Sequence, residues 1–273
     1  MSNIVYIVKQ AGSKMSRNEH LREVLEQLYL KYHRPEYIHP DPLEFPRRYP
    51  DPADREVVAL LASSMAFGRV EQIMNSVEKV LLKMGKSPAG YVLKKGGMAG
   101  DFNGFCHRWV DGSQVDGLLA GIRGVLEAHG TLNNCMVEHM REGDGTINAG
   151  LSGLAGEIRR HPGGNCHYLV PQPGLGSACK RLHLFLRWMV RNDEVDPGGW
   201  TGVLPGDLLV PLDTHMFRAG RLLGFTSRRT ADFGAVLEIT QGFRELSPLD
   251  PVRYDFSLTR LGIRKDASME ELF

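Results

Sequence analysis

Asp213 is the carboxylate best placed for chemistry, because it stands where an apolar run changes to a helical pattern. Residues 207–224 read Asp-Leu-Leu-Val-Pro-Leu-Asp-Thr-His-Met-Phe-Arg-Ala-Gly-Arg-Leu-Leu-Gly. Pro211 ends the run, so the aspartate two residues later can cap the first N–H groups of a helix. The helix dipole favours its ionised form. A fixed negative charge can stabilise a cationic transition state, although the same residue can also be an N-cap without chemistry.

Lys180 is the candidate nucleophile. A helix is expected over 177–191, and its apolar stripe consists of Leu182, Phe185, Leu186, Met189 and Val190. The spacing places Lys180, Arg187 and Arg191 nearly opposite that stripe, on a polar face. Lys180 lies in the first turn, directly after a glycine-containing loop. The alternative interpretation is a solvated lysine without a catalytic role.

The loop before this helix reads Val170-Pro-Gln-Pro-Gly-Leu-Gly-Ser177. Glycines let a backbone approach a phosphate closely, and the N–H groups at the start of a helix can bind it. The loop is therefore a candidate phosphate-binding hairpin.

The hairpin and the Asp213 segment together resemble the helix-hairpin-helix DNA glycosylase superfamily, of the endonuclease III type. In that resemblance Asp213 matches the catalytic aspartate, with Thr214, His215 and Arg218 beside it. Lys180 matches the lysine that attacks C1′ of the sugar, but it stands two residues further from the loop proline than in endonuclease III. The stretch 192–207 looks like an insertion, which is similar to the archaeal 8-oxoguanine glycosylase branch. The layout also resembles an uncharacterised bacterial family of similar length.

The resemblance implies an all-α, two-lobed helical bundle. Its parts would be an N-terminal helix and proline-rich connector (1–53) that pack with the C-terminal lobe, a helix-hairpin-helix lobe (54–225) and C-terminal helices (226–273). The implied function is base-excision repair: a DNA glycosylase with AP lyase activity, acting as a monomer on double-stranded DNA with a damaged base, 8-oxoguanine being the lesion suggested. The DNA-binding candidates are Gly174, Gly176, Ser177, Arg181, Arg187, His215 and Arg218. Phe67, Trp188 and Trp200 are candidates for the base pocket.

No cofactor is expected. No cysteine follows Cys179, so the C-terminal iron–sulfur motif of many endonuclease III relatives is absent from the sequence. Two alternatives stay open. One is a DNA-binding protein without chemistry; the other is a zinc site built from Cys166, His167, Cys179 and His183.

The composition is that of a globular protein without a global charge signal. The 273 residues carry 33 basic and 32 acidic side chains, a formal net charge of +1, so DNA affinity would need a local patch. No long apolar run or secretory signal is seen, which predicts a cytoplasmic protein that does not enter membranes. The four cysteines are widely spaced and are expected to be free thiols.

Hydrophobic spacing is helical nearly throughout, apart from a short alternation near 4–8. Helices are expected over 17–33, 54–66, 69–84, 115–129, 132–142, 147–160, 177–191, 214–224, 230–244 and 250–258. The proline-rich stretch 39–52 is expected to be either a loop near the DNA or a rigid connector.

Overall fold

The computed structural model describes residues 16–94, 100–161 and 165–263. The alternation near residues 4–8 lies outside them. The described chain is mostly helical and has one two-stranded antiparallel hairpin, so the all-α class is confirmed. The helices before residue 100 are α2 (Arg17–Tyr32), α3 (Glu44–Arg47), α4 (Pro52–Ser64), α5 (Val70–Met84) and α6 (Pro88–Leu93), and a 3₁₀ turn η1 spans Pro35–Tyr37.

The rest of the chain begins with the hairpin of β1 (Cys106–His107) and β2 (Val110–Asp111). It continues with α7 (Gly112–His129), α8 (Leu132–Glu142), α9 (Ile147–Arg160), α10 (Lys180–Val190), η2 (Pro205–Asp207), α11 (Thr214–Leu222), α12 (Phe233–Leu246) and α13 (Asp255–Ile263). Each of the ten expected helices has a counterpart. The short elements η1, α3, α6, β1, β2 and η2 were not expected, because elements this short carry little periodicity.

Local caps explain where several helices start. Asp51 accepts hydrogen bonds from the N–H groups of Ala53 and Asp54, and Pro52 occupies the first turn of α4. Asp111 and Gln114 form a capping box at the start of α7. The hydroxyls of Thr131 and Thr146 cap α8 and α9 by accepting from the N–H groups of Asn134 and Ala149.

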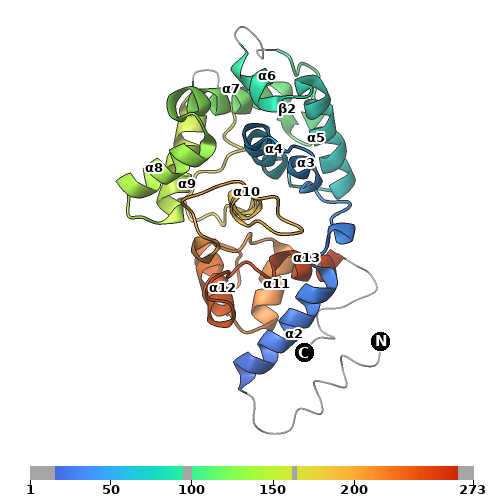
Figure 1. The fold of residues 1–273 in the computed structure, drawn as a ribbon, viewed down its shortest axis with the longest axis vertical. Coiled ribbons are helices and arrows are strands. Elements are labelled where there is room, and N and C mark those ends of the chain that lie inside the picture. The colour runs from blue at the N-terminus through green and yellow to red at the C-terminus, as the bar shows by residue number, and fades with distance from the viewer. Residues whose placement is uncertain (1–15, 95–99, 162–164, 264–273) are drawn as a thin grey trace.

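The helices form two groups on either side of α10 (Figure 1). Helices α4 to α9 lie on one side and α2, α11, α12 and α13 on the other, while α10 is seen nearly end-on between them. Helix α10 packs against α4, and α2 packs against α12 and α13. The lobe boundaries at residues 53 and 225 stay a prediction. Helix α11, which that division assigns to the 54–225 lobe, packs against α12 and α13.

The central position of α10 overturns the expected polar face of this helix. Every residue from Leu182 to Val190 is buried, including Arg187, and Arg191 directly after the helix is buried as well. The one-stripe rule fails because α10 is covered on all sides, and such a helix keeps buried charges only if they are paired.

The partners of the two arginines come from distant segments. Arg187 donates to Asp196 at 3.0 and 3.2 Å and also to Asp255. Arg191 donates to Asp250 at 3.0 Å, to Asp193 and to Asp196. The stretch 192–207, which looks like an insertion, therefore supplies carboxylates that neutralise α10.

No helix in the described part of the chain is long and apolar enough to cross a membrane. All four cysteines are free, as expected.

Candidate active site

Asp213 is the N-cap of α11. Its Oδ1 accepts a hydrogen bond of 2.9 Å from the N–H of Met216. The second oxygen, Oδ2, takes no part in this capping bond. The side chain is 22% exposed. The cap expected from the sequence is thus present, and it fixes the carboxylate at the start of the helix.

Lys180 is the first residue of α10, and its Nζ lies 3.5 Å from Oδ2 of Asp213. The helix starts at Lys180 rather than at Ser177, because Cys179 adopts a left-handed conformation with φ of 43°. That conformation costs a non-glycine residue about 1–2 kcal/mol. The turn brings the amine and the carboxylate together although 33 positions separate them in the sequence.

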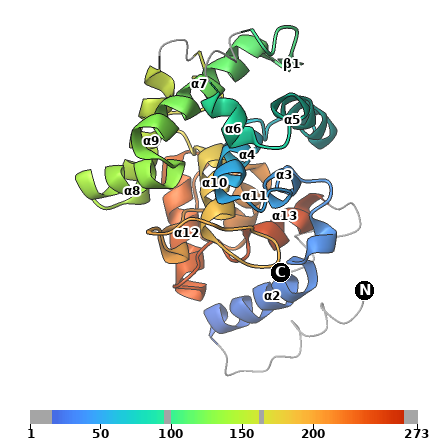
Figure 2. The same cartoon turned by 45° about the horizontal axis from the view of Figure 1, so that its top comes forward.

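The pair lies at a pocket of about 480 Å³. Five segments line it: the connector, the end of α4, the start of α5, α10 with the start of α11, and α13. The lining residues include Pro40, Asp41, Pro42, Ala66, Phe67, Gly68, Val70, Ile73, Lys180, Leu184, Arg187, Pro211, Asp213, Thr214, His215, Asp255, Phe256, Thr259 and Arg260. Figure 2 shows how α10, α11 and α13 meet in the middle of the molecule.

The charged groups of this pocket are arranged in pairs. Lys180 faces Asp213, Arg187 bonds Asp255, and Arg260 bonds Asp41. Burial raises the pKa of Asp255 to about 6, although the charge of Arg187 acts in the opposite direction. The lining therefore has no excess of one sign.

The predicted hairpin has the backbone that its glycines suggest. Gly174 and Gly176 have φ of 89° and 80°, and a Cβ at either position would meet nothing within 4 Å. The glycines are needed for conformation rather than for packing. Gly174, Leu175, Gly176 and Ser177 are exposed, so this backbone is open to a ligand.

A groove of about 380 Å³ runs along the hairpin and shares Ala66, Phe67 and Lys180 with the pocket. It is also lined by Gly176, Ser177 and the segment 230–232 before α12. The carbonyl of Gly176 accepts a hydrogen bond of 3.0 Å from the N–H of Phe233, which ties the hairpin to α12. Lys180 thus stands where the hairpin groove meets the pocket.

The predicted DNA-binding arginines fall in different places. Arg187 is buried and its guanidinium is taken up by two carboxylates, so the structure contradicts its assignment as a DNA contact. Arg181 donates to the carbonyls of Ser64 and Tyr168 and stacks on Phe67 and Tyr168, so these contacts tie the start of α10 to the end of α4, and its DNA contact stays a prediction. Arg218 is exposed on α11, four residues after Thr214 at the pocket.

His215 and Phe67 line the pocket as the sequence suggested, whereas Trp188 and Trp200 are buried elsewhere. Sequence reasoning missed Asp41, Asp255 and Arg260 as lining residues. A signal existed for Asp255: a carboxylate between Tyr254 and Phe256, in an otherwise apolar stretch, predicts a buried and therefore paired charge.

The zinc alternative at Cys166, His167, Cys179 and His183 is not supported. Among the described residues, the clusters with ligand atoms close enough for a metal are His129 with Cys135 and Glu157, and His33 with Asp193 and Asp196. Nδ1 of His167 accepts a hydrogen bond of 2.8 Å from Arg159, and His183 is fully buried, which lowers its pKa to about 4.

A family model described as "Protein of unknown function (DUF2400)" matches residues 41–264. The chain belongs to this family. The match begins at Asp41 of the connector and includes every residue from there on that lines the pocket. Searches of curated proteins and of solved structures find no match.

Proposed function

We propose that the protein is a DNA glycosylase with AP lyase activity that removes a damaged base, and that Lys180 and Asp213 carry the reaction. The observation behind this proposal is the 3.5 Å distance between Lys180 Nζ and Asp213 Oδ2 at the mouth of a pocket. An amine and a fixed carboxylate at this distance can both address one sugar carbon.

The pocket suits an uncharged ring. Its volume of about 480 Å³ lies in the range of roughly 300–1,000 Å³ that is usual for small-molecule sites. Because its charges are paired, it offers no net attraction to a free anion such as a nucleotide phosphate. A glycosylase needs this combination, since the base is turned out of the duplex while the phosphates stay outside.

The phosphates would contact the exposed hairpin. Gly176 and Ser177 line the groove that leads to Lys180, and Gly174 is exposed two residues before them. Backbone contacts from these residues to phosphates would fix the register of the DNA without reading its sequence. The two extra residues before Lys180 are taken up by the loop, because α10 starts at Lys180. This supports a hairpin that is two residues longer than that of endonuclease III, with Lys180 still in the position of the nucleophile.

In the proposed reaction the ammonium of Lys180 passes a proton to the leaving base, the amine so formed attacks C1′, and the N-glycosidic bond breaks. The positive charge that develops on the sugar is stabilised by Asp213. The amine and C1′ then form a Schiff base, elimination breaks the strand at the 3′ phosphate, and water releases the enzyme. The two-lobed arrangement around α10 fits the glycosylase type of bundle.

The test is borohydride trapping on duplexes that carry one lesion each, with 8-oxoguanine first, followed by uracil and an abasic site. The wild-type protein should give a covalent adduct and a cleaved strand. Lys180→Arg keeps the charge but cannot form the Schiff base, so it should bind DNA and give no adduct. Lys79→Ala, an exposed lysine of α5, is the matched control and should trap normally.

Asp213→Asn should lose base release while it retains DNA binding, because asparagine is also a good N-cap. Asp111→Asn, at the cap of α7, is its control. If no lesion yields an adduct or a released base while salt-sensitive DNA binding persists in all variants, the protein is a binding module and the enzymatic proposal is wrong.

A further inference from the structure

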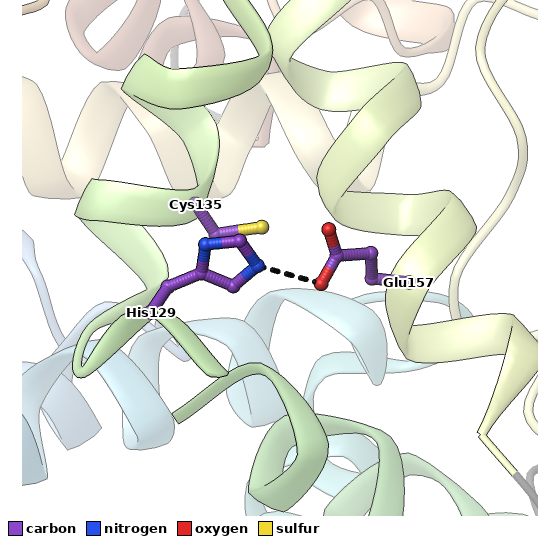
Figure 3. Close-up of side chains that lie close together, drawn as sticks. All are labelled: His129, Cys135 and Glu157. Carbon is purple, nitrogen blue, oxygen red and sulfur yellow. Dashed lines mark hydrogen bonds and ion pairs between the residues drawn. The ribbon is translucent and has the colours of Figure 1, made fainter. Parts of the chain in front are cut away.

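A cluster of potential metal ligands lies on α7, α8 and α9, and none of its residues lines the pocket described above. His129 ends α7, Cys135 lies on α8, and Glu157 lies on α9. Their side chains point toward one another (Figure 3). One ligand atom from each lies within 4.8 Å of the other two.

A second imidazole, that of His139 one helical turn after Cys135, contacts the same carboxylate from just outside this three-residue group. His139 Nε2 lies 2.6 Å from Oε1 of Glu157, and His129 Nε2 lies 2.9 Å from Oε2 of the same carboxylate. Both imidazoles thus turn Nε2 toward Glu157. Residues four apart on a helix share a face, so Cys135 and His139 both lie on the side of α8 that faces Glu157, and a small movement of His139 would complete a four-ligand site.

We propose that His129, Cys135, His139 and Glu157 bind a zinc ion that ties α7, α8 and α9 together. Zinc takes four ligands from imidazole nitrogens, thiolates and carboxylates in a tetrahedron. Neighbouring ligand atoms in such a tetrahedron stand roughly 3.4 Å apart, as zinc–ligand bonds of about 2.0–2.3 Å require. On this scale the contacts of 2.6 and 2.9 Å to Glu157 would lengthen by about 0.8 and 0.5 Å.

The outer contacts of the histidines strengthen the assignment. Glu138 lies 2.7 Å from Nδ1 of His129, and Glu142 lies 3.7 Å from Nδ1 of His139. Metal-binding histidines usually donate their second ring N–H to a carboxylate, which fixes the tautomer that presents the other nitrogen. Here both rings have a carboxylate on the Nδ1 side and the shared site on the Nε2 side.

The charges and protons balance. Zn²⁺ replaces the thiol proton of Cys135, which passes to water together with any proton carried on a ring Nε2. The resulting thiolate and the Glu157 carboxylate neutralise the two charges of the ion. Cys135 is buried, while the other three side chains are 14–24% exposed, so the ion has a way in from solvent.

Cys135 and His139 form a Cys-x-x-x-His pair, and the sequence contains a second pair of this spacing that lacks further ligands. Cys179 and His183 have the same spacing on and beside α10, but no third or fourth ligand lies with them among the described metal-capable groups. In the cluster of His33, Asp193 and Asp196, the charge of Arg191 is bound to both aspartates, which opposes a cation there. Among the described residues, only the α7–α9 cluster combines a thiol, an imidazole and a carboxylate within 4.8 Å, with a second imidazole at the same carboxylate.

The test is a titration of the metal-free full-length protein with Co²⁺, followed by displacement with Zn²⁺. One equivalent of Co²⁺ should produce the visible bands of a tetrahedral site and a thiolate-to-cobalt absorption in the near ultraviolet, and Zn²⁺ should abolish both. In a weakly buffered solution, Zn²⁺ binding should release at least one proton per ion.

Cys135→Ser should remove the thiolate absorption, and its matched control Cys179→Ser should retain it. Because Cys135 is buried and its replacement can unfold the protein, Glu138→Gln serves as a second variant at an exposed position. It should fold normally and weaken Zn²⁺ binding by roughly 10–100-fold, as the loss of an outer carboxylate does. Absence of binding near one equivalent, or a thiolate absorption that survives Cys135→Ser in folded protein, would overturn the proposal.

Discussion

Replacing Arg187 by methionine should destabilise the protein strongly. The side chains of Arg187, Asp196 and Asp255 are at most 4% exposed, so the methionine would leave Asp255 buried without its partner. Removing one member of a buried ion pair costs about 3–5 kcal/mol. Asp196 keeps Arg191, so the loss is concentrated on Asp255. Urea unfolding at pH 8 should therefore show a decrease of about 3–5 kcal/mol in the free energy of unfolding.

The cost should depend on pH in a defined direction. Burial already raises the pKa of Asp255 to about 6 in the folded protein, and removing Arg187 takes away an interaction that lowers it. A carboxyl group whose pKa is higher in the folded than in the unfolded state stabilises the protein at low pH and loses that contribution as pH rises. The difference between variant and wild type should grow above pH 6, by at most about 1.4 kcal/mol per pH unit.

Two further variants serve as controls for this experiment. Arg48→Ala removes an ion pair with Glu78 whose side chains are 44% and 42% exposed, and it should cost no more than about 1 kcal/mol. Adding Asp255→Asn to Arg187→Met should recover part of the loss, because no buried charge is then left unpaired. If Arg187→Met costs as little as Arg48→Ala at every pH, the conclusion that Arg187 compensates a buried charge on Asp255 is wrong.

Three other outcomes are expected from unfolding measurements. Glu56 is buried, its pKa is raised by burial to about 7, and it accepts from two N–H groups at the start of α8 and from an indole. Glu56 should therefore make wild-type stability fall by up to about 1.4 kcal/mol per unit between pH 5 and 7. Glu56→Gln should remove this contribution and leave, below pH 6, only the slope that Asp255 contributes. Gly176→Ala should cost about 1–2 kcal/mol, because φ is 80° there, whereas Gly156→Ala inside α9 should gain about 0.5–1 kcal/mol. Asp213→Ala should cost about 0.5–2 kcal/mol and Asp213→Asn almost nothing, so a uniform loss in both would show that capping is not what the side chain contributes.

The helices could be predicted because their signals are local. The aspartate before α11 and the periodic apolar residues within α5 and α9 act over a few positions, and tertiary contacts did not override them. The start of α10 could not be predicted in this way. The left-handed turn at Cys179 carries no residue that favours it, and it moved the first helical residue from 177 to 180.

The candidate site was predictable only in part, for a similar reason. Lys180 and Asp213 stand in recognisable segments, and so do the hairpin glycines. The other walls of the pocket come from the connector and from α13. Asp41 of the connector lies 139 positions before Lys180 in the sequence, and Asp255 of α13 lies 75 positions after it. No periodicity within a segment indicates a partner that far away, so the pairing of Asp41 with Arg260 could not be predicted.

The same distant charges explain how Lys180 and Asp213 are held next to each other. Lys180, Leu184 and Arg187 follow the i, i+4, i+7 rule and share the face of α10 that lines the pocket. Arg187 bonds Asp255 at the start of α13, and Arg191 bonds Asp250 just before it. Turning α10 by one residue would rotate this face by about 100° and break both contacts. The position of the Lys180 amine relative to Asp213 is therefore set by ion pairs two and three turns further along α10, as well as by the hairpin before it.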